Sequence, residues 1–252
     1  MLPILNIGPL AIQAPGLIIL IGIWLALTLI EKNSVKFNVD SNVLSNLILW
    51  FLLSIVLFAR IGYVAKYFSV FVERPLSILS PNLALFDPLS GLILGSVFFL
   101  VLIQRKKLHF RDVLNALTPG LSIFAIFYFL SLLASGQYYG LPSSLPWAIP
   151  LWGIERHPLQ LYYVLLLIIL SAWIFWLVEK EKKISFLFLE FVRWFSVILI
   201  FLDFFRGDGA MQIGSIHILQ IVGFLLLLSS FILLKRFQAE KISPSVIQRA
   251  EK

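Results

Sequence analysis

The stretch IERHPLQLYYV (154–164) holds the residue types with the most chemical potential in this sequence. Arg156 carries a permanent cation that can bind a phosphate or carboxylate through two parallel hydrogen bonds. His157 carries an imidazole, a group that can accept or donate a proton. If the segment is helical, Arg156 and Gln160 lie four residues apart and share one face. The spacing predicts a site for an anion, with His157 as a weak candidate for a general base.

A second interpretation of His157 requires no chemistry. A polar residue can cap the start of a helix, and proline is favoured at the first helical position. His157 followed by Pro158 fits that pattern, so both interpretations of the histidine stay open. Capping leaves Arg156 and Gln160 unexplained.

The elements that must position these residues are membrane-spanning helices. Of the 252 residues, 60% are hydrophobic and 13% are charged, whereas about a quarter of a soluble domain is charged. A spanning helix needs about 20 mostly apolar residues. About seven stretches approach that length: 16–30, 43–59, 89–103, 117–134, 158–178, 186–205 and 215–234. The sequence predicts an all-α polytopic membrane protein with a single transmembrane domain (1–236) and a short cytoplasmic tail (237–252).

Basic residues concentrate on one side of the predicted spans. QRKKLHFR (104–111), EKEKK (179–183) and KRFQAEK (235–241) follow the third, fifth and seventh spans. The first 30 residues contain no Lys or Arg, so the first helix is expected to be retained. Because basic loops stay in the cytoplasm, we expect the N-terminus outside and the C-terminus in the cytoplasm. The net charge of +7 has the same explanation, and no nucleic-acid partner is expected.

The outer ends of the predicted helices carry the unusual polar groups. Ionisable side chains at membrane depth are costly and mark function by default. The outer set is Arg60, Asp87, Gln137, Arg156, His157, Gln160, Asp203, Arg206, Asp208, His217 and Gln220. The predicted substrate-binding residues are Arg60, Gln137, Arg156, His157, Gln160 and Arg206. Asp203 and Arg206 are also spaced to form a local ion pair.

The sequence offers no metal-binding pattern. Its three histidines are scattered and it contains no cysteine, so neither a metal site nor a cofactor is predicted.

Several motifs resemble, in order, those of the prolipoprotein diacylglyceryl transferase family. RHPLQLYY (156–163) is similar to the family's Arg-His-Pro-Ser-Gln-Leu-Tyr-Glu and is the most specific match. ARIGYV (59–64) resembles Arg-x-Gly-Tyr, SGQYYG (135–140) resembles Asn-Gly-Glu-x-x-Gly, and FFRGDG (204–209) resembles the Phe-Phe-Arg segment. The resemblance covers roughly residues 15–236.

The resemblance implies a function in lipoprotein biosynthesis in the bacterial cytoplasmic membrane. Such an enzyme moves diacylglyceryl from phosphatidylglycerol to the lipobox cysteine of a secreted prolipoprotein. The implied partners are phosphatidylglycerol, or another anionic lipid, and a prolipoprotein signal peptide. Arg156 and Arg206 would hold the lipid phosphate.

The sequence departs from the family at charged positions. Leu89 stands at the histidine of the family's His-Gly-Gly, Gln137 at the glutamate of Asn-Gly-Glu, Tyr163 at the last glutamate of the Arg-His-Pro motif, and Leu199 at an arginine. Residues 113–154 contain no Lys, Arg or His, although the family has Gly-Arg-x-Gly-Asn-Phe there. Two hypotheses stay open: a diacylglyceryl transferase, or a catalytically inactive relative that binds anionic lipid or a lipoprotein precursor. A transporter is disfavoured because no broken helices are indicated.

Overall fold

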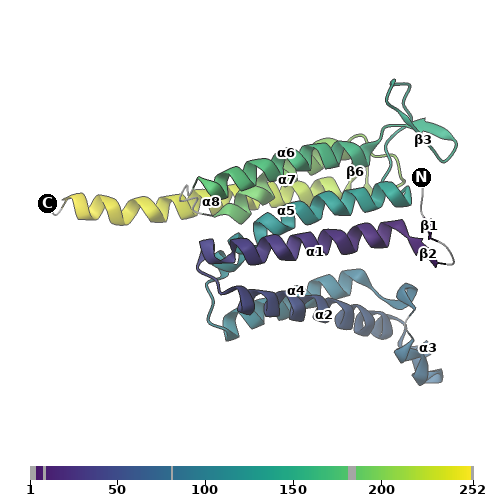
Figure 1. The fold of residues 1–252 in the computed structure, drawn as a ribbon, viewed down its shortest axis with the longest axis horizontal. Coiled ribbons are helices and arrows are strands. Elements are labelled where there is room, and N and C mark those ends of the chain that lie inside the picture. Colours follow the sequence, from purple (N-terminus) through teal and green to yellow (C-terminus); the bar gives the residue numbers. More distant parts are fainter. Residues whose placement is uncertain (1–3, 8–9, 81, 181–185, 251–252) are drawn as a thin grey trace. The chain divides into compact units, whose positions relative to one another are not determined.

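The computed structural model describes residues 4–7, 10–80, 82–180 and 186–250 (Figure 1). The helices in these residues are α1 (Ala14–Ser34), α2 (Ser41–Lys66), α3 (Phe68–Glu73), α4 (Pro88–Arg105), α5 (Phe110–Ser135), α6 (Leu159–Glu179), α7 (Leu187–Asp203) and α8 (Ile218–Ala250). Short 3-10 helices are η1 (Val35–Phe37), η2 (Pro75–Leu79) and η3 (Leu83–Leu85). Antiparallel hairpins pair β1 (Ile4–Ile7) with β2 (Leu10–Gln13), β3 (Ile149–Leu151) with β4 (Ile154–Arg156), and β5 (Gln212–Ile213) with β6 (Ile216–His217).

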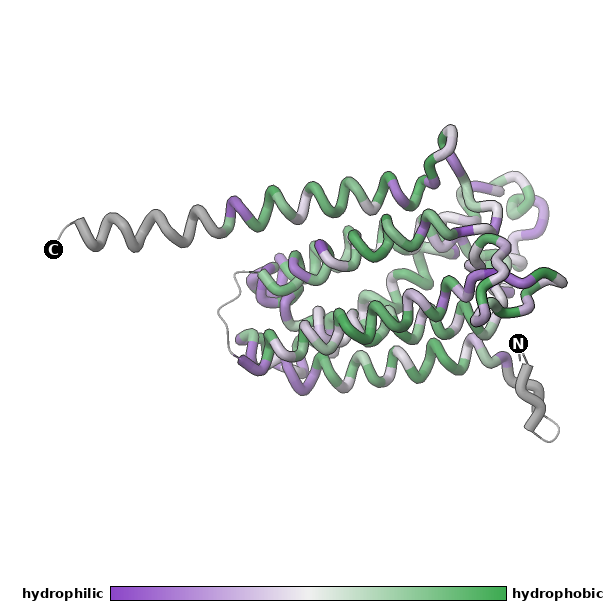
Figure 2. The backbone as a smooth tube through the Cα atoms, turned by 90° about the horizontal axis from the view of Figure 1, so that it is seen from above, coloured by the Kyte–Doolittle hydropathy of each residue, from purple (hydrophilic) through white to green (hydrophobic). Residues whose placement is uncertain are grey.

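Six helices in the described residues are long and apolar enough to cross a membrane. They are α1 with η1, α2, α4, α5, α6 and the 218–237 part of α8. Figure 2 shows hydrophobic residues along the helices and hydrophilic residues gathered near their ends. The prediction of an all-α polytopic membrane protein is confirmed.

The predicted count of seven spans depends on α7. This helix has 17 residues, which at 1.5 Å per residue gives a length of about 26 Å. The hydrocarbon core of a bilayer is about 30 Å thick. The seventh span and the orientation of the termini therefore stay predictions. Most of the predicted basic loop at 179–183 lies outside the described residues.

The chain divides into two compact units, which are described separately. Unit 1 comprises residues 1–30 and 117–252, and unit 2 comprises residues 31–116. In unit 2, α2 and α4 approach closely through small residues. A Cβ at Gly91 would lie 2.6 Å from the Ile55 carbonyl oxygen and 2.8 Å from the Ala59 Cβ. Small residues at helix crossings permit such backbone contact within membranes.

In unit 1, α6, α7 and α8 run in alternating directions along the bundle (Figure 1). Gly223 of α8 packs on α7, where an added Cβ would lie 3.0 Å from both Leu199 and Ile200. The ring of Tyr163 is fully buried and stacks on Phe129 of α5 with centroids 4.0 Å apart. Alternation brings the end of α5, the start of α6, the end of α7 and the start of α8 to one end, which we call the polar end of unit 1.

Two local predictions are wrong at the start of α6. Pro158 occupies the N-cap position without a side-chain cap hydrogen bond, and the helix begins at Leu159. His157 therefore does not cap the helix. Arg156 belongs to strand β4, so Arg156 and Gln160 do not share a helix face. The hairpin β3–β4 continues directly to Pro158, and proline restricts the residue before it to extended conformations.

A polar candidate site at one end of unit 1

Three loops are joined by backbone hydrogen bonds at the polar end of unit 1. The Gly140 N–H donates to the His157 carbonyl (3.2 Å), and the His157 N–H donates to Leu141 (3.0 Å). The Leu141 N–H then donates to Phe205 (2.8 Å). Isolated bridges pair Gly140 with Arg206 and Pro142 with Arg156. The loop after α5 thus lies between the loops that carry Arg156 and Arg206.

Glycine makes this junction possible. A Cβ at Gly140 would lie 2.6 Å from the His157 Cβ and 2.7 Å from the His157 carbonyl oxygen. A Cβ at Gly207 would lie 2.7 Å from the Gly140 carbonyl oxygen. Because real Cβ atoms do not approach neighbours so closely, the two glycines set the distance between the loops.

Arg206 is held between carboxylates and an aromatic ring. Its Nε and Nη2 donate to the two oxygens of Asp208 at 2.7 and 3.0 Å. Its Nη1 lies 3.5 Å from Asp203 Oδ1, which confirms the ion pair expected from the sequence. The guanidinium carbon lies 4.1 Å from the centre of the Tyr138 ring. Burial acts to lower the pKa of Arg206, but its hydrogen bonds to Asp208 and the nearby negative charges raise this pKa overall.

Asp203 connects Arg206 to a histidine on the following hairpin. Its side chain is completely buried, and Oδ1 accepts a hydrogen bond from the Tyr138 hydroxyl at 3.3 Å. Oδ2 lies 2.9 Å from His217 Nδ1. His217 Nε2 lies 2.7 Å from Gln212 Nε2, its partner across the β5–β6 hairpin. With the ring proton on Nδ1, on the side of Asp203, Nε2 would accept a hydrogen bond from Gln212.

A cavity of about 480 Å³ opens beside this cluster. Its polar lining residues are Gln137, Tyr138, Arg206 and Asp208, and its apolar ones include Leu132, Met211 and Ile218. Burial raises the pKa of Tyr138, so its phenol stays neutral at physiological pH. A cavity lined by both charged and apolar side chains matches an amphipathic ligand.

The RHP segment lies on the neighbouring loop. Arg156 stacks on the Tyr139 ring at 4.6 Å and donates to the carbonyls of Leu151 (3.3 Å) and Gly140 (3.5 Å). His157 Nδ1 lies 3.2 Å from the Tyr162 hydroxyl. Gln160 is fully buried and donates to the backbone carbonyl of Gln137. Five of the six predicted site residues thus occur on segments that meet at this end.

The sixth predicted residue, Arg60, belongs to unit 2. It is 9% exposed and donates to the carbonyls of Ile78 (2.8 Å), Leu85 (2.7 Å) and Ser77 (2.5 Å). The guanidinium therefore ties the segment between α3 and α4 to the end of α2. Its predicted contact with substrate stays a prediction.

The predicted binding set omitted Asp203, Asp208 and His217. All three had appeared among the outer polar residues, and each is close in sequence to Arg206 or to the start of α8. The available signal was an aspartate and a histidine 14 positions apart on either side of a predicted helix–helix turn. Only the hairpin β5–β6, which hydropathy does not indicate, shows that they meet.

This combination of fold and site defines a polytopic helical membrane protein with a charged, amphipathic cavity at one end of its bundle. The model of the prolipoprotein diacylglyceryl transferase family matches residues 3–236, and the chain belongs to this family.

This chain is similar to named members of the family over most of their length. Phosphatidylglycerol–prolipoprotein diacylglyceryl transferases of Brucella canis and Brucella anthropi are 32% and 31% identical to this chain, each over 84% of it and 80% of the relative. The Finegoldia magna enzyme of the same name is 24% identical over 90% of this chain and 92% of its own length.

Proposed function

We propose that this chain transfers diacylglyceryl from phosphatidylglycerol to the lipobox cysteine of a prolipoprotein, in the bacterial cytoplasmic membrane. The observation that carries the proposal is the cavity at the polar end of unit 1, where a guanidinium and apolar side chains line the same space. Family membership agrees with this activity. Such a cavity suits a lipid whose charged head and acyl chains must both be held.

The reaction requires a cation, a base and an apolar surface. The cysteine thiolate attacks the carbon of the diacylglyceryl group that bears the phosphate. The thiolate rather than the thiol is the nucleophile. A sulfur–carbon bond forms, the carbon–oxygen bond breaks, and glycerol phosphate leaves with the bonding electrons. The thiol proton passes to a base, and developing charge on the phosphate needs fixed donors.

Arg206 lines the cavity, but Arg156, on the neighbouring loop, has more N–H groups free to bind the phosphate. A guanidinium has five N–H donors, and Arg156 uses two of them in long bonds to carbonyls. Arg206 instead gives two short bonds to Asp208. In this proposal Arg156 binds the phosphate directly, while Arg206 orders the cavity wall and contributes a partly neutralised positive field.

His217 is the base that we propose for the thiol proton. Asp203 beside Nδ1 stabilises the imidazolium that forms when Nε2 takes a proton, an arrangement that general-base histidines need. Gln212 must then give up its place at Nε2 to the thiol. His157, the candidate from the sequence, has a hydroxyl rather than a carboxylate beside Nδ1.

A second candidate function is binding of anionic lipid or precursor without turnover. The specific observation in its favour is that two family charges are replaced together, with Tyr163 and Leu199 now in contact. The Tyr163 hydroxyl donates to the Leu199 carbonyl at 3.4 Å. Compared with the family pattern, the polar end has lost two charges but still has a cavity. This would suit binding without turnover.

The experiment uses the purified full chain in nanodiscs that contain phosphatidylglycerol labelled in its diacylglyceryl part. A lipobox peptide is added, and the thioether-linked lipopeptide is measured by mass spectrometry. Product formation supports the transferase, whereas retained lipid without product supports the binding protein. Arg156→Ala is expected to weaken lipid retention about 10-fold or more, and the exposed Arg74→Ala serves as the matched control.

The base is tested with the same assay. His217→Gln is expected to lower the rate about 100-fold or more, with a smaller effect for His157→Gln. Thermal unfolding of both variants shows whether each one folds. A well-folded His217→Gln variant with full activity would rule out the proposed base.

A further inference from the structure

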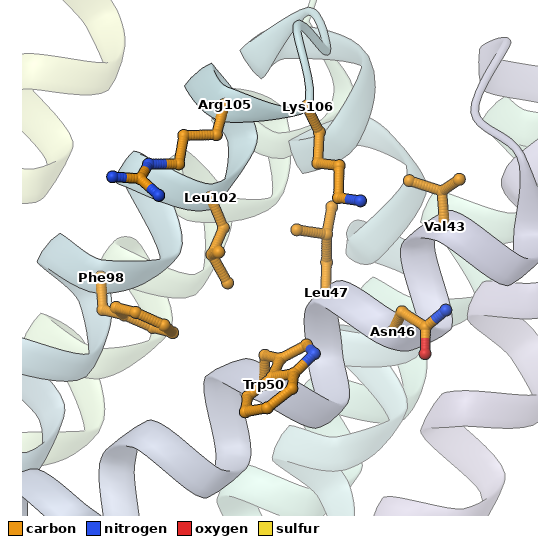
Figure 3. Close-up of a pocket in the computed structure, with 8 residues that line it drawn as sticks. All are labelled: Val43, Asn46, Leu47, Trp50, Phe98, Leu102, Arg105 and Lys106. Atoms are coloured by element: carbon orange, nitrogen blue, oxygen red, sulfur yellow. The ribbon is translucent and has the colours of Figure 1, made fainter.

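A second cavity lies at the opposite end of unit 2 from Arg60. It has a volume of about 470 Å³ and is formed between α2 and α4 (Figure 3). Its lining includes Asn46 and Trp50 from α2, Phe98 and Leu102 from α4, and Arg105 with Lys106 at the end of α4. Asn46 is 14 residues before Arg60, so about 21 Å of helix separates their levels. The two therefore lie toward opposite ends of α2, whose 26 residues give a length of about 39 Å, enough to cross an apolar core about 30 Å thick.

The cavity is polar at its rim and apolar below it. Figure 3 shows Lys106 reaching from α4 toward α2, above Leu47, while the Arg105 guanidinium lies on the side of Phe98. Phe98 is seven residues before Arg105, so the apolar wall extends about 10 Å from the charged rim. Trp50 is 55% exposed, and its indole closes the lower part of the cavity.

The two cations have no carboxylate partner in the described part of the chain. Arg105 and Lys106 end α4 and are exposed. Lys107 follows in the left-handed region with φ of 52°, a conformation that a residue with a Cβ seldom adopts. Three consecutive basic residues thus surround one helix end. Basic pockets between helices at the cytoplasmic surface typically recognise anionic lipid headgroups.

We propose that this groove binds one anionic phospholipid from the leaflet that faces the basic loops. Arg105 and Lys106 hold the headgroup phosphate, and the Asn46 amide contributes a polar contact at the rim. The upper part of an acyl chain lies along Leu102, Phe98 and Trp50. The charge of the rim selects an anionic over a zwitterionic lipid. All the lining residues belong to unit 2, so this proposal does not depend on the transferase proposal for unit 1.

The test is photocrosslinking of the full chain in nanodiscs. A phosphatidylglycerol with a photoreactive group near the start of its acyl chain is titrated, and labelled peptides are mapped. Labelling is expected in residues 43–50 and 98–106. Each basic residue contributes about five-fold to affinity for an anionic lipid. The variant Arg105→Gln/Lys106→Gln is therefore expected to raise the half-maximal lipid concentration about 25-fold.

The control variant Lys180→Gln/Lys235→Gln removes one charge at the end of α6 and one within α8, and it should leave labelling unchanged. Asn46→Leu keeps every charge and should weaken labelling several-fold, which separates recognition from altered membrane topology. A phosphatidylcholine probe should label these residues only weakly. Inorganic phosphate should not compete with the phosphatidylglycerol probe. Equal labelling by phosphatidylcholine, competition by free phosphate, or normal labelling of the Arg105→Gln/Lys106→Gln variant would overturn the proposal.

Discussion

The two units bury an arginine in different electrostatic settings. In unit 2, Arg60 donates to three backbone carbonyls, which satisfy its N–H groups but do not neutralise its charge. In unit 1, Arg206 is neutralised by Asp208 and Asp203 beside a cavity. The same residue type therefore orders backbone in one unit and gives a cavity a charged lining in the other. Residue type and predicted membrane depth alone did not distinguish the role of Arg60 from that of Arg206.

Unit 1 also contains a buried, uncharged contact at two positions where the family resemblance implies charged residues. Tyr163 is completely buried, Leu199 is 6% exposed, and the two touch through a hydrogen bond. The family resemblance places a glutamate and an arginine at these positions. Since a single buried charge without its partner is costly, we predict that charges placed at these two positions would be energetically coupled.

The largest expected effect comes from restoring those charges one at a time. Tyr163→Glu alone should lower the free energy of unfolding by about 3–5 kcal/mol, because it buries an unpaired carboxylate. Leu199→Arg alone should have a similar effect. The double variant should recover about 1–3 kcal/mol relative to the sum. Reversible unfolding in mixed micelles, followed by tryptophan fluorescence, measures all three; strictly additive losses would contradict the predicted coupling.

Removal of Arg60 should be the next largest effect. Arg60→Ala leaves three carbonyls near the end of α2 without their donor, and each unpaired buried group costs about 1–3 kcal/mol. Some of this cost is recovered by water, so we expect a loss of about 3 kcal/mol in the free energy of unfolding. Arg74→Ala, at an exposed position, should change it little. A stable Arg60→Ala variant that has lost lipid binding would instead assign Arg60 to substrate.

An added methyl group should destabilise the protein more at Gly140, in the loop junction of unit 1, than at a glycine with open space around it. Gly140→Ala places a methyl group 2.6 Å from the His157 Cβ, and such overpacking costs about 1–3 kcal/mol. Gly16→Ala is the matched control, because a Cβ there meets no atom within 4 Å. Thermal unfolding compares the two variants. Equal midpoints would show that the loops can move apart without loss of stability.

The sequence predicted most of the fold because helix length and apolar content are strong local signals. It also predicted that Gln137, Arg156 and Arg206 lie at one end, because alternating helix directions bring every second loop together. It did not predict the β3–β4 and β5–β6 hairpins, whose strands have two or three residues each. These hairpins place Arg156 outside α6 and bring His217 to Asp203, so the local chemistry depended on turns that hydropathy does not encode.

The smallest predicted effect sharpens the comparison between the two arginines. Asp208→Asn removes the carboxylate that neutralises Arg206 and should leave its guanidinium more positive toward the cavity. We expect affinity for an anionic lipid to increase about five-fold, equivalent to about 1 kcal/mol for one nearby charge. Native mass spectrometry of lipid retained by the purified chain measures the change. Asp40→Asn, which removes a carboxylate that caps α2, is the control. Because the gain requires the freed guanidinium, it should disappear in the variant Asp208→Asn/Arg206→Ala, and its persistence there would mean that the lipid interacts with a different cation.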